Sequence, residues 1–201
     1  YRLWRDLLDN WKIFAENPLV KHFINTPNQD FKDPVQEPIN NDLDDLASRL
    51  PISSDSSQAR AIAHAMAGRT FILQGPPGTG KSQTITNLLA RALSEGKRIL
   101  FVAEKKDALD VVKNRLDAIG LGVFSLDLHD KGMNPKVVKE QLSNVIDIEI
   151  QTDRVGYENA RGEHDNAILP LKKYRIRLHE VGKLGESIYS AIDKKLALNS
   201  E

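Results

Sequence analysis

The sequence predicts an α/β fold in which a parallel sheet is flanked by helices. From Ser53 onward, short apolar runs alternate with segments whose apolar residues recur at helical spacing. A glycine-rich stretch, GPPGTGKS, lies between one such run and the helical pattern that follows it. Strands that alternate with helices pair in parallel through right-handed crossovers, so these observations together indicate an α/β domain.

Three apolar runs supply the predicted strands, namely Phe71–Leu73, Ile99–Ala103 and Val123–Leu126. Helical patterns follow the first two runs, over Gln83–Leu93 and Asp107–Ile119. We assign this alternating region to one domain, residues 51–150.

Residues 1–50 are predicted to be a helical segment followed by a linker. One face of an amphipathic helix is formed by Trp4, Leu7, Leu8, Trp11 and Phe14, which recur at three- and four-residue steps. We interpret this face as packing against a neighbouring core, with a platform for stacking nucleic-acid bases as the alternative. Prolines amid polar residues predict a loop over residues 25–42, and residues 43–50 are predicted to form a short acidic helix.

Helical patterns dominate the rest of the chain. A helix is predicted from Pro135 to about Ile150, with Asn134 as its cap. Residues 151–201 form a third predicted region, a coiled-coil-like insertion of two helices interrupted near Gly182 and Gly185. Their densely charged outer faces favour an antiparallel helical hairpin.

Composition restricts the classes of function. The 201 residues contain 28 basic and 28 acidic side chains, so any basic surface for nucleic acid must be local. The absence of cysteine excludes disulfides, cysteine-based zinc sites and thiol catalysis, and fits a cytoplasmic location. No apolar run approaches the roughly 20 residues of a membrane span, so we expect no membrane partner. The chain begins with Tyr1 and ends within a charged pattern, and we expect it to be an excerpt of a longer protein.

The glycine-rich stretch fits the G-x-x-x-x-G-K-[ST] pattern of a P-loop at every fixed position. Glycines allow backbone conformations in which successive N–H groups point at phosphate oxygens, and the following helix adds the positive end of its dipole. Lys81 is the predicted catalytic cation for the β- and γ-phosphates, and Ser82 supplies a hydroxyl ligand for Mg²⁺. The predicted nucleotide-binding residues of this stretch are Gly75, Pro76, Pro77, Gly78, Thr79, Gly80, Lys81, Ser82 and Gln83.

Gln58 narrows the identity of the nucleotide. It lies at a predicted helix start, just before the strand that leads into the P-loop. Its amide offers one donor and one acceptor, which match N7 and N6 of adenine, although a solvated glutamine is the ordinary alternative. ATP with Mg²⁺ is therefore the predicted ligand pair.

These motifs, in this order and spacing, resemble superfamily I helicases. The segment Ser54–Arg60, the P-loop and the strand Ile99–Ala103 with its helix carry the resemblance, which covers Leu50–Ile146. It is closest to the Upf1-like, DNA2/NAM7-type branch, and especially to the N-terminal part of the motor in large multidomain bacterial proteins. The resemblance implies a RecA-like domain, and it implies that Gln58 reads adenine.

The resemblance also implies contacts with single-stranded nucleic acid, DNA more than RNA, in the full-length protein. Lys105 and Lys106 lie in the turn where the family touches the nucleic-acid backbone and often has Pro-Ser-Asn or Pro-Thr-Asn. The two lysines would meet phosphate as cations, with a solvated turn as the alternative. His129 and Lys131 are further candidates, at the end of the third predicted strand.

One part of a working motor is missing from the sequence. Such motors hold Mg²⁺ and polarise water with adjacent Asp-Glu after an apolar strand, and no such pair follows Ser82. We therefore expect this chain to bind adenine nucleotide weakly and to hydrolyse almost none. Two alternatives stay open: an AAA-type ATPase, and a nucleotide-switched interaction module that binds a protein partner through its C-terminal helices.

Overall fold

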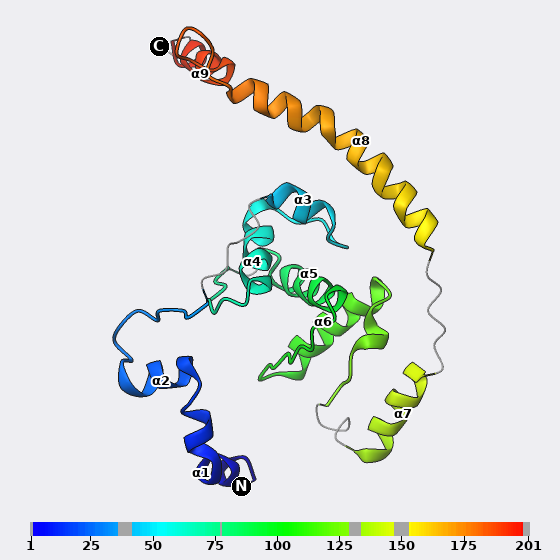
Figure 1. Cartoon of the computed structure of the whole chain (residues 1–201). Helices are drawn as coiled ribbons and strands as arrows, with labels where there is room; N and C mark the ends of the chain where they lie inside the picture. The colour runs from blue at the N-terminus through cyan, green and yellow to red at the C-terminus, as the bar shows by residue number, and fades with distance from the viewer. Residues whose placement is uncertain (1, 36–41, 77, 129–133, 147–152, 199–201) are drawn as a thin grey trace. The chain divides into compact units, whose positions relative to one another are not determined.

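The computed structural model describes residues 2–35, 42–76, 78–128, 134–146 and 153–198 (Figure 1). These described residues form nine α-helices and one 3₁₀-helix, and none of them is in a β-strand. The chain divides into two compact units, Tyr1–Asp147 and Ile148–Glu201, each of which is described by itself.

The first unit contains most of the predicted helices. Those predicted over residues 43–50, 83–93 and 107–119, and from Pro135, are confirmed with shifted ends. The helices of this unit are α1 (Arg2–Phe14), α2 (Pro18–Asn25), α3 (Leu43–Ser48), α4 (Ser56–Met66), α5 (Lys81–Ser94), α6 (Lys106–Ala118), the 3₁₀-helix η1 (Gly122–Phe124) and α7 (Pro135–Ile146).

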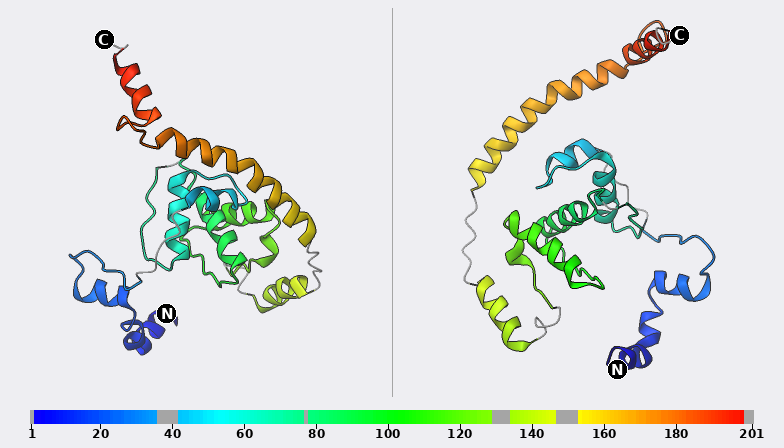
Figure 2. Two further views of the ribbon diagram at one scale, coloured as in Figure 1. Left: turned by 45° about the horizontal axis from the view of Figure 1, so that its top comes forward. Right: turned by 180° about the vertical axis from the view of Figure 1, so that it is seen from behind.

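Helix α4 contacts both α3 and α5, and an apolar cluster fills the space between them (Figure 2). Its most buried member is Ile62, whose exposed fraction is 0%.

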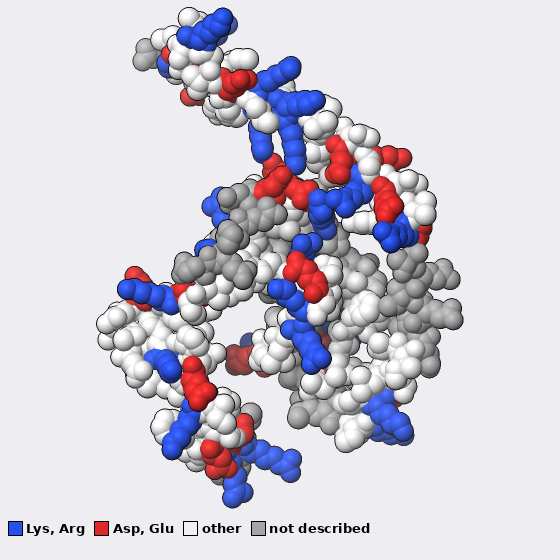
Figure 3. Space-filling view, in the orientation of Figure 1, with Lys and Arg blue, Asp and Glu red and all other residues white. Residues whose placement is uncertain are grey.

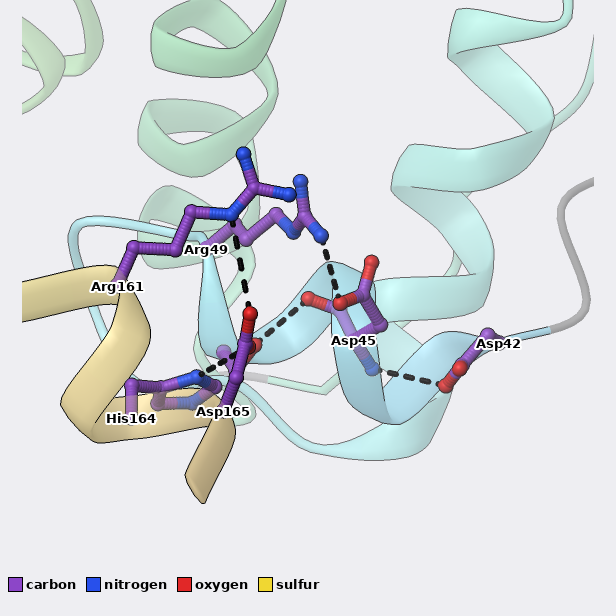
Figure 4. Close-up of polar contacts among 7 residues, drawn as sticks. Asp42, Asp45, Arg49, Arg161, His164 and Asp165 are labelled. Atoms are coloured by element: carbon purple, nitrogen blue, oxygen red, sulfur yellow. Dashed lines mark hydrogen bonds and ion pairs between the residues drawn. The ribbon is translucent and has the colours of Figure 1, made fainter. Parts of the chain in front are cut away.

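Helix α3 is short and starts at a side-chain cap, because Asp42 accepts a 3.0 Å hydrogen bond from the Asp45 N–H. Asp45 also forms a 2.9 Å ion pair with Arg49 one turn later (Figure 4). The apolar cluster between α3, α4 and α5 consists of Leu43, Leu46, Leu50, Ile62, Ala63, Met66 and Leu88.

A second apolar cluster joins α5 to α6. Leu89 of α5 packs with Val112 and Leu116 of α6, and all three side chains are buried. Phe101 packs against this cluster from the extended segment before α6. Helix α5 therefore lies between two cores, with α4 on one side and α6 on the other (Figure 1).

The predicted parallel sheet is wrong for the described residues. Segments 71–73 and 99–103 are extended, but they carry no strand pairing, and residues 123–124 belong to η1. Alternate side chains point away from the core, as in a strand: Ile72 is 93% exposed, Leu100 82% and Val102 75%. Alternating apolar residues therefore gave alternating exposure but no strands, because a strand also requires a hydrogen-bonded neighbour.

An apolar groove of about 630 Å³ lies where the segments before α6 and after η1 meet α5 and α6. Its walls include residues 97–103 and 125–128. No described residue of the glycine-rich loop lines it, so this groove is separate from the predicted phosphate site.

One side-chain amide joins helix α7 to the segment that comes before it in the chain. Gln141 accepts a 3.0 Å hydrogen bond from the Asp127 N–H and donates a 3.2 Å bond to the Asp127 carbonyl. The amide thereby gives a partner to both the backbone N–H and the backbone carbonyl of Asp127. None of the described residues forms a strand that could do so.

The amphipathic helix predicted at the N-terminus is confirmed as α1, but its aromatic face does not pack against a core. Trp4, Leu8 and Trp11 each expose more than half of their side-chain surface. Helix α2 follows after Asn17, whose side chain accepts the N–H of Leu19 at 2.9 Å and caps the helix.

The second unit contains α8 (Arg154–His179) and α9 (Ile188–Leu198), so the predicted interruption near Gly182 and Gly185 is confirmed. Gly185 has φ +75°, a conformation that ends helical structure easily. The predicted hairpin is wrong, because α9 meets α8 at its C-terminal end and does not run back along it (Figures 1 and 2). The His179 and Tyr189 rings lie 4.7 Å apart at this junction.

Charge along α8 is uneven. Near its middle, Asp165 lies 3.2 Å from the His164 ring nitrogen and 3.9 Å from Arg161 (Figure 4). Toward its end, Lys and Arg side chains gather on the surface (Figure 3); they are Lys172, Lys173, Arg175 and Arg177. Among the described residues, no helix has the length and apolar character that crossing a membrane requires.

Truncation of Ile62 should destabilise the first unit much more than the same change at an exposed position. Ile62→Ala removes buried methyl groups between α3, α4 and α5, and we expect it to cost about 2–5 kcal/mol of unfolding free energy. Ile72→Ala is the matched control, because Ile72 is 93% exposed, and it should cost less than about 0.5 kcal/mol. Urea denaturation followed by circular dichroism measures both, and equal losses would contradict the described core.

Candidate phosphate and nucleotide site

The predicted P-loop connects an extended segment to α5 and is shaped by its own short contacts. Thr79 donates a 2.8 Å hydrogen bond from its hydroxyl to the Pro76 carbonyl, which closes the loop on itself. Gly78 and Gly80 have φ +86° and +78°, so both positions favour glycine over any other residue. Pro77 lies outside the described residues.

Two glycines of the loop also leave room for close neighbours. A Cβ at Gly75 would lie 2.6 Å from the Thr79 hydroxyl oxygen, so a side chain there would break the closure of the loop. A Cβ at Gly80 would lie 2.6 Å from Nε2 of Gln58. The second approach shows that Gln58 reaches the loop.

Helix α5 starts directly from the loop and presents its N-terminus to it. Gly80 occupies the cap position with a left-handed backbone and no side-chain cap hydrogen bond. The first-turn N–H groups of an α-helix lack partners within the helix, and no acidic residue lies in the first turn of α5. This end of α5 therefore attracts anions.

Lys81 and Ser82 lie in this first turn, and the structure brings both to the loop. The Lys81 side chain is exposed and donates from Nζ to the Gly75 carbonyl, so its ammonium folds back across the loop. Ser82 is half-buried, and its carbonyl accepts a 2.8 Å bond from the Thr86 hydroxyl. The Lys81 ammonium thus lies at the loop from which α5 begins.

Gln58 is brought to the P-loop from the start of α4, 21 residues earlier in the chain. Its Nε2 donates to the Thr79 carbonyl at 3.3 Å, and its Oε1 accepts from the Asp55 N–H at 3.3 Å. The second bond completes a capping box, because Asp55 in turn accepts the Gln58 N–H at 2.8 Å. Both bonds of the Gln58 side chain are long, so they are weak.

Two residues of α5, one turn apart, hold the segment that leads into α4. Gln83 donates to the Ser53 carbonyl, so this predicted nucleotide-binding residue contacts protein backbone. Asn87 accepts the Ile52 N–H at 3.1 Å and donates to the Ile52 carbonyl at 2.8 Å. Sequence analysis missed Asn87, because its neighbours at three- and four-residue steps include Gln83, Thr84 and Arg91 and give no signal of a contact with Ile52.

The predicted nucleic-acid residues are not brought together with the P-loop by any contact of the described chain. Lys105 caps α6 without a side-chain cap hydrogen bond, and Lys106 begins the helix. Both side chains are exposed. His129 and Lys131 lie outside the described residues.

With this geometry described, comparison with known proteins gives the family. The AAA domain family, AAA_11, matches residues 53–193, which include α4, the P-loop, α5 and α6. The chain belongs to the AAA domain family. No solved structure matches it.

Curated relatives share shorter stretches with this AAA domain. An uncharacterized ATP-dependent helicase of Mycoplasma genitalium, MG140, is 52% identical over 62 residues, which are 31% of this chain and 6% of that protein. The DNA-binding protein SMUBP-2 of Mesocricetus auratus is 38% identical over 63 residues, 31% of this chain and 6% of its own length. The ATP-dependent helicase NAM7 of Saccharomyces cerevisiae is 32% identical over 134 residues, 66% of this chain and 12% of that protein. The matched part therefore spans a small fraction of each relative.

The capping box of the AAA domain gives Asp55 a depressed pKa. The Ser57 hydroxyl donates to the Asp55 carboxylate at 2.6 Å and is the main cause, and the Gln58 N–H adds to it. Hydrogen bonds to the charged form lower the pKa of a carboxyl group below its ordinary value, 3.8. The cap is therefore present above the ordinary aspartate pKa and is lost as pH falls through the depressed value.

Removal of the Ser57 hydroxyl should raise the pKa of Asp55. In the wild-type chain, we expect an NMR titration of the Asp55 carboxyl to have its midpoint below 3.8. Ser57→Ala removes the main stabilising donor, so the midpoint should move up toward 3.8. An unchanged midpoint in Ser57→Ala would contradict the assignment of this hydrogen bond as the main cause.

Proposed function

We propose that this AAA domain is the ATP-binding portion of an ATP-dependent superfamily I helicase or translocase of the Upf1-like branch. The contact between Gln58 and the P-loop carries this proposal, because a side-chain amide able to pair with adenine contacts Thr79 of the loop. The family match and relatives named as ATP-dependent helicases support it. The proposed parent is a large multidomain protein.

Phosphate binding rests on groups that already face the loop. The first-turn N–H groups of α5 are available to phosphate oxygens, and Lys81 exchanges the neutral Gly75 carbonyl for a charged phosphate. Ser82 adds a hydroxyl oxygen, the kind of hard ligand that Mg²⁺ prefers, and the bound ion neutralises charge on the triphosphate. Lys81 thus acts on the β- and γ-phosphates directly.

Adenine recognition requires Gln58 to exchange partners as well. Its amide gives up the two 3.3 Å bonds to Thr79 and Asp55 and offers its donor and acceptor to the base. Because both bonds are at the weak end of the usual range, the exchange costs little.

Nucleic acid is the proposed partner of the parent protein, single-stranded DNA more than RNA. Lys105 and Lys106 are exposed at the start of α6, where cations can meet backbone phosphates. The proposed turnover of the chain itself is low, because no adjacent Asp-Glu pair follows Ser82 in its sequence. Hydrolysis at a rate typical of a helicase, with DNA present and abolished by Lys81→Ala, would contradict this.

Lys81→Ala should weaken ATP and inorganic tripolyphosphate to the same extent. The variant removes a charge-assisted contact to phosphate, and we expect about tenfold to hundredfold weaker binding of both ligands in the presence of Mg²⁺. Isothermal titration calorimetry measures the two affinities. Lys113→Ala, which removes a half-buried cation that pairs with Asp117 on α6, is the control and should leave both unchanged. Unaltered affinity in Lys81→Ala would overturn the phosphate site.

Gln58→Ala should weaken ATP while sparing tripolyphosphate. Loss of the adenine contact should cost about fivefold to tenfold in ATP affinity, because tripolyphosphate has no base to lose. The same titrations of Asp55→Ala control for the capping box, since this change disrupts the cap of α4 but keeps the Gln58 amide. A parallel loss of both ligands in Gln58→Ala would argue against a base-reading role.

A further inference from the structure

Asn87 is an unusual residue for the middle of a helix core. Its exposed fraction is 0%, and it comes directly before Leu88 and Leu89, which pack against the two apolar clusters. Thr84 and Thr86, its buried polar neighbours, donate their hydroxyls back to carbonyls of their own helix, Gly80 and Ser82. Asn87 instead reaches out of α5 to a segment 35 residues earlier in the chain.

Asn87 uses both the acceptor and the donor of its side-chain amide in this contact. Ile52 gives it one N–H and one carbonyl, at 3.1 and 2.8 Å, so the side chain pairs with this residue as a neighbouring strand would. Gln83, one turn nearer the P-loop, donates to the next carbonyl, that of Ser53. Two consecutive residues of the approach to α4 are thereby fixed to α5.

The fixed segment leads directly into the cap of α4, which Gln58 completes. Ser53 is two residues before Asp55, whose carboxylate caps α4 and whose N–H bonds the Gln58 side chain. Gln58 then contacts Thr79 in the loop from which α5 begins. The contacts form a closed ring that runs from α5 through Ile52 and the cap of α4 to Gln58 and back to the start of α5.

We propose that Asn87 is a positioning residue for nucleotide recognition, which sets the distance between the adenine-reading Gln58 and the phosphate loop by holding Ile52 against α5. This inference rests on the proposed function, because it assumes that the P-loop binds ATP and that Gln58 reads the base. Asn87 touches neither ligand group and acts through Gln58.

Asn87→Leu tests the proposal, because leucine has a similar size and shape but cannot pair with Ile52. On the 201-residue chain, calorimetric titration with Mg²⁺ and either ATP or tripolyphosphate gives the preference for ATP. We expect Asn87→Leu to lower this preference about fivefold and to leave tripolyphosphate affinity within about twofold of wild type. In a Gln58→Ala background, the same substitution should have no further effect on the preference, since it acts through Gln58.

Gln141→Met is the matched control. Gln141 makes the same two-bond contact with the backbone of Asp127, at 3.0 and 3.2 Å, but it is connected to α7 and not to α4. Its loss should leave the ATP preference unchanged. If Asn87→Leu does not fold, Asn87→Ser removes the same paired contact and leaves space that water can occupy.

Amide hydrogen exchange provides a readout that needs no ligand. In Asn87→Leu or Asn87→Ser, the N–H groups of Ile52, Ser57 and Gln58 should exchange faster, while those of α6 should not change. Unchanged exchange, an ATP preference equal to wild type, or an equal loss in Gln141→Met overturns the proposal. A wild-type chain that binds neither ligand overturns the proposed function, and with it the role of Asn87, whereas binding of both ligands with a failed Asn87 test overturns this inference alone.

Discussion

Burial of α5 on two sides is the constraint on which the first unit depends. Leu88 faces the cluster shared with α3 and α4, and Leu89 faces the cluster shared with α6. Because consecutive residues of one helix serve two cores, α5 can neither rotate nor slide without opening both. The predicted P-loop runs directly into the N-terminus of this helix, so the loop ends on an element that two apolar clusters hold in place.

In the described residues, side-chain amides make backbone contacts of the kind that strand pairing makes in α/β proteins. Asn87 pairs with Ile52 and Gln141 pairs with Asp127, each through one donor and one acceptor. Backbone polar groups must find partners when they are removed from water, and an amide matches a peptide group in both shape and chemistry. Each contact holds its own segment: Asn87 holds the segment that leads into α4, and Gln141 joins α7 to Asp127.

The extended segments show why the predicted sheet was wrong. The alternation around Ile72 and around Leu100 is a local property, set by the sequence and by the extended backbone. Pairing depends on a second segment at hydrogen-bonding distance, and the described residues place none there. Helix α1 is a second example. The helical spacing of its aromatic residues correctly predicted the helix, but it did not predict whether the apolar face would be covered.

The sequence by itself determined the P-loop, the helix that follows it and most helix positions, because these depend on neighbours a few residues apart. Gly78 and Gly80 supply the positive φ angles, and Lys81 and Ser82 follow at fixed spacing in the first turn of α5. The tertiary structure alone decided that Gln58 reaches Thr79 and that Asn87 holds Ile52, contacts that span 21 and 35 residues. Such contacts follow from how α4 packs on α5, and the spacing of residues in either helix does not specify that packing.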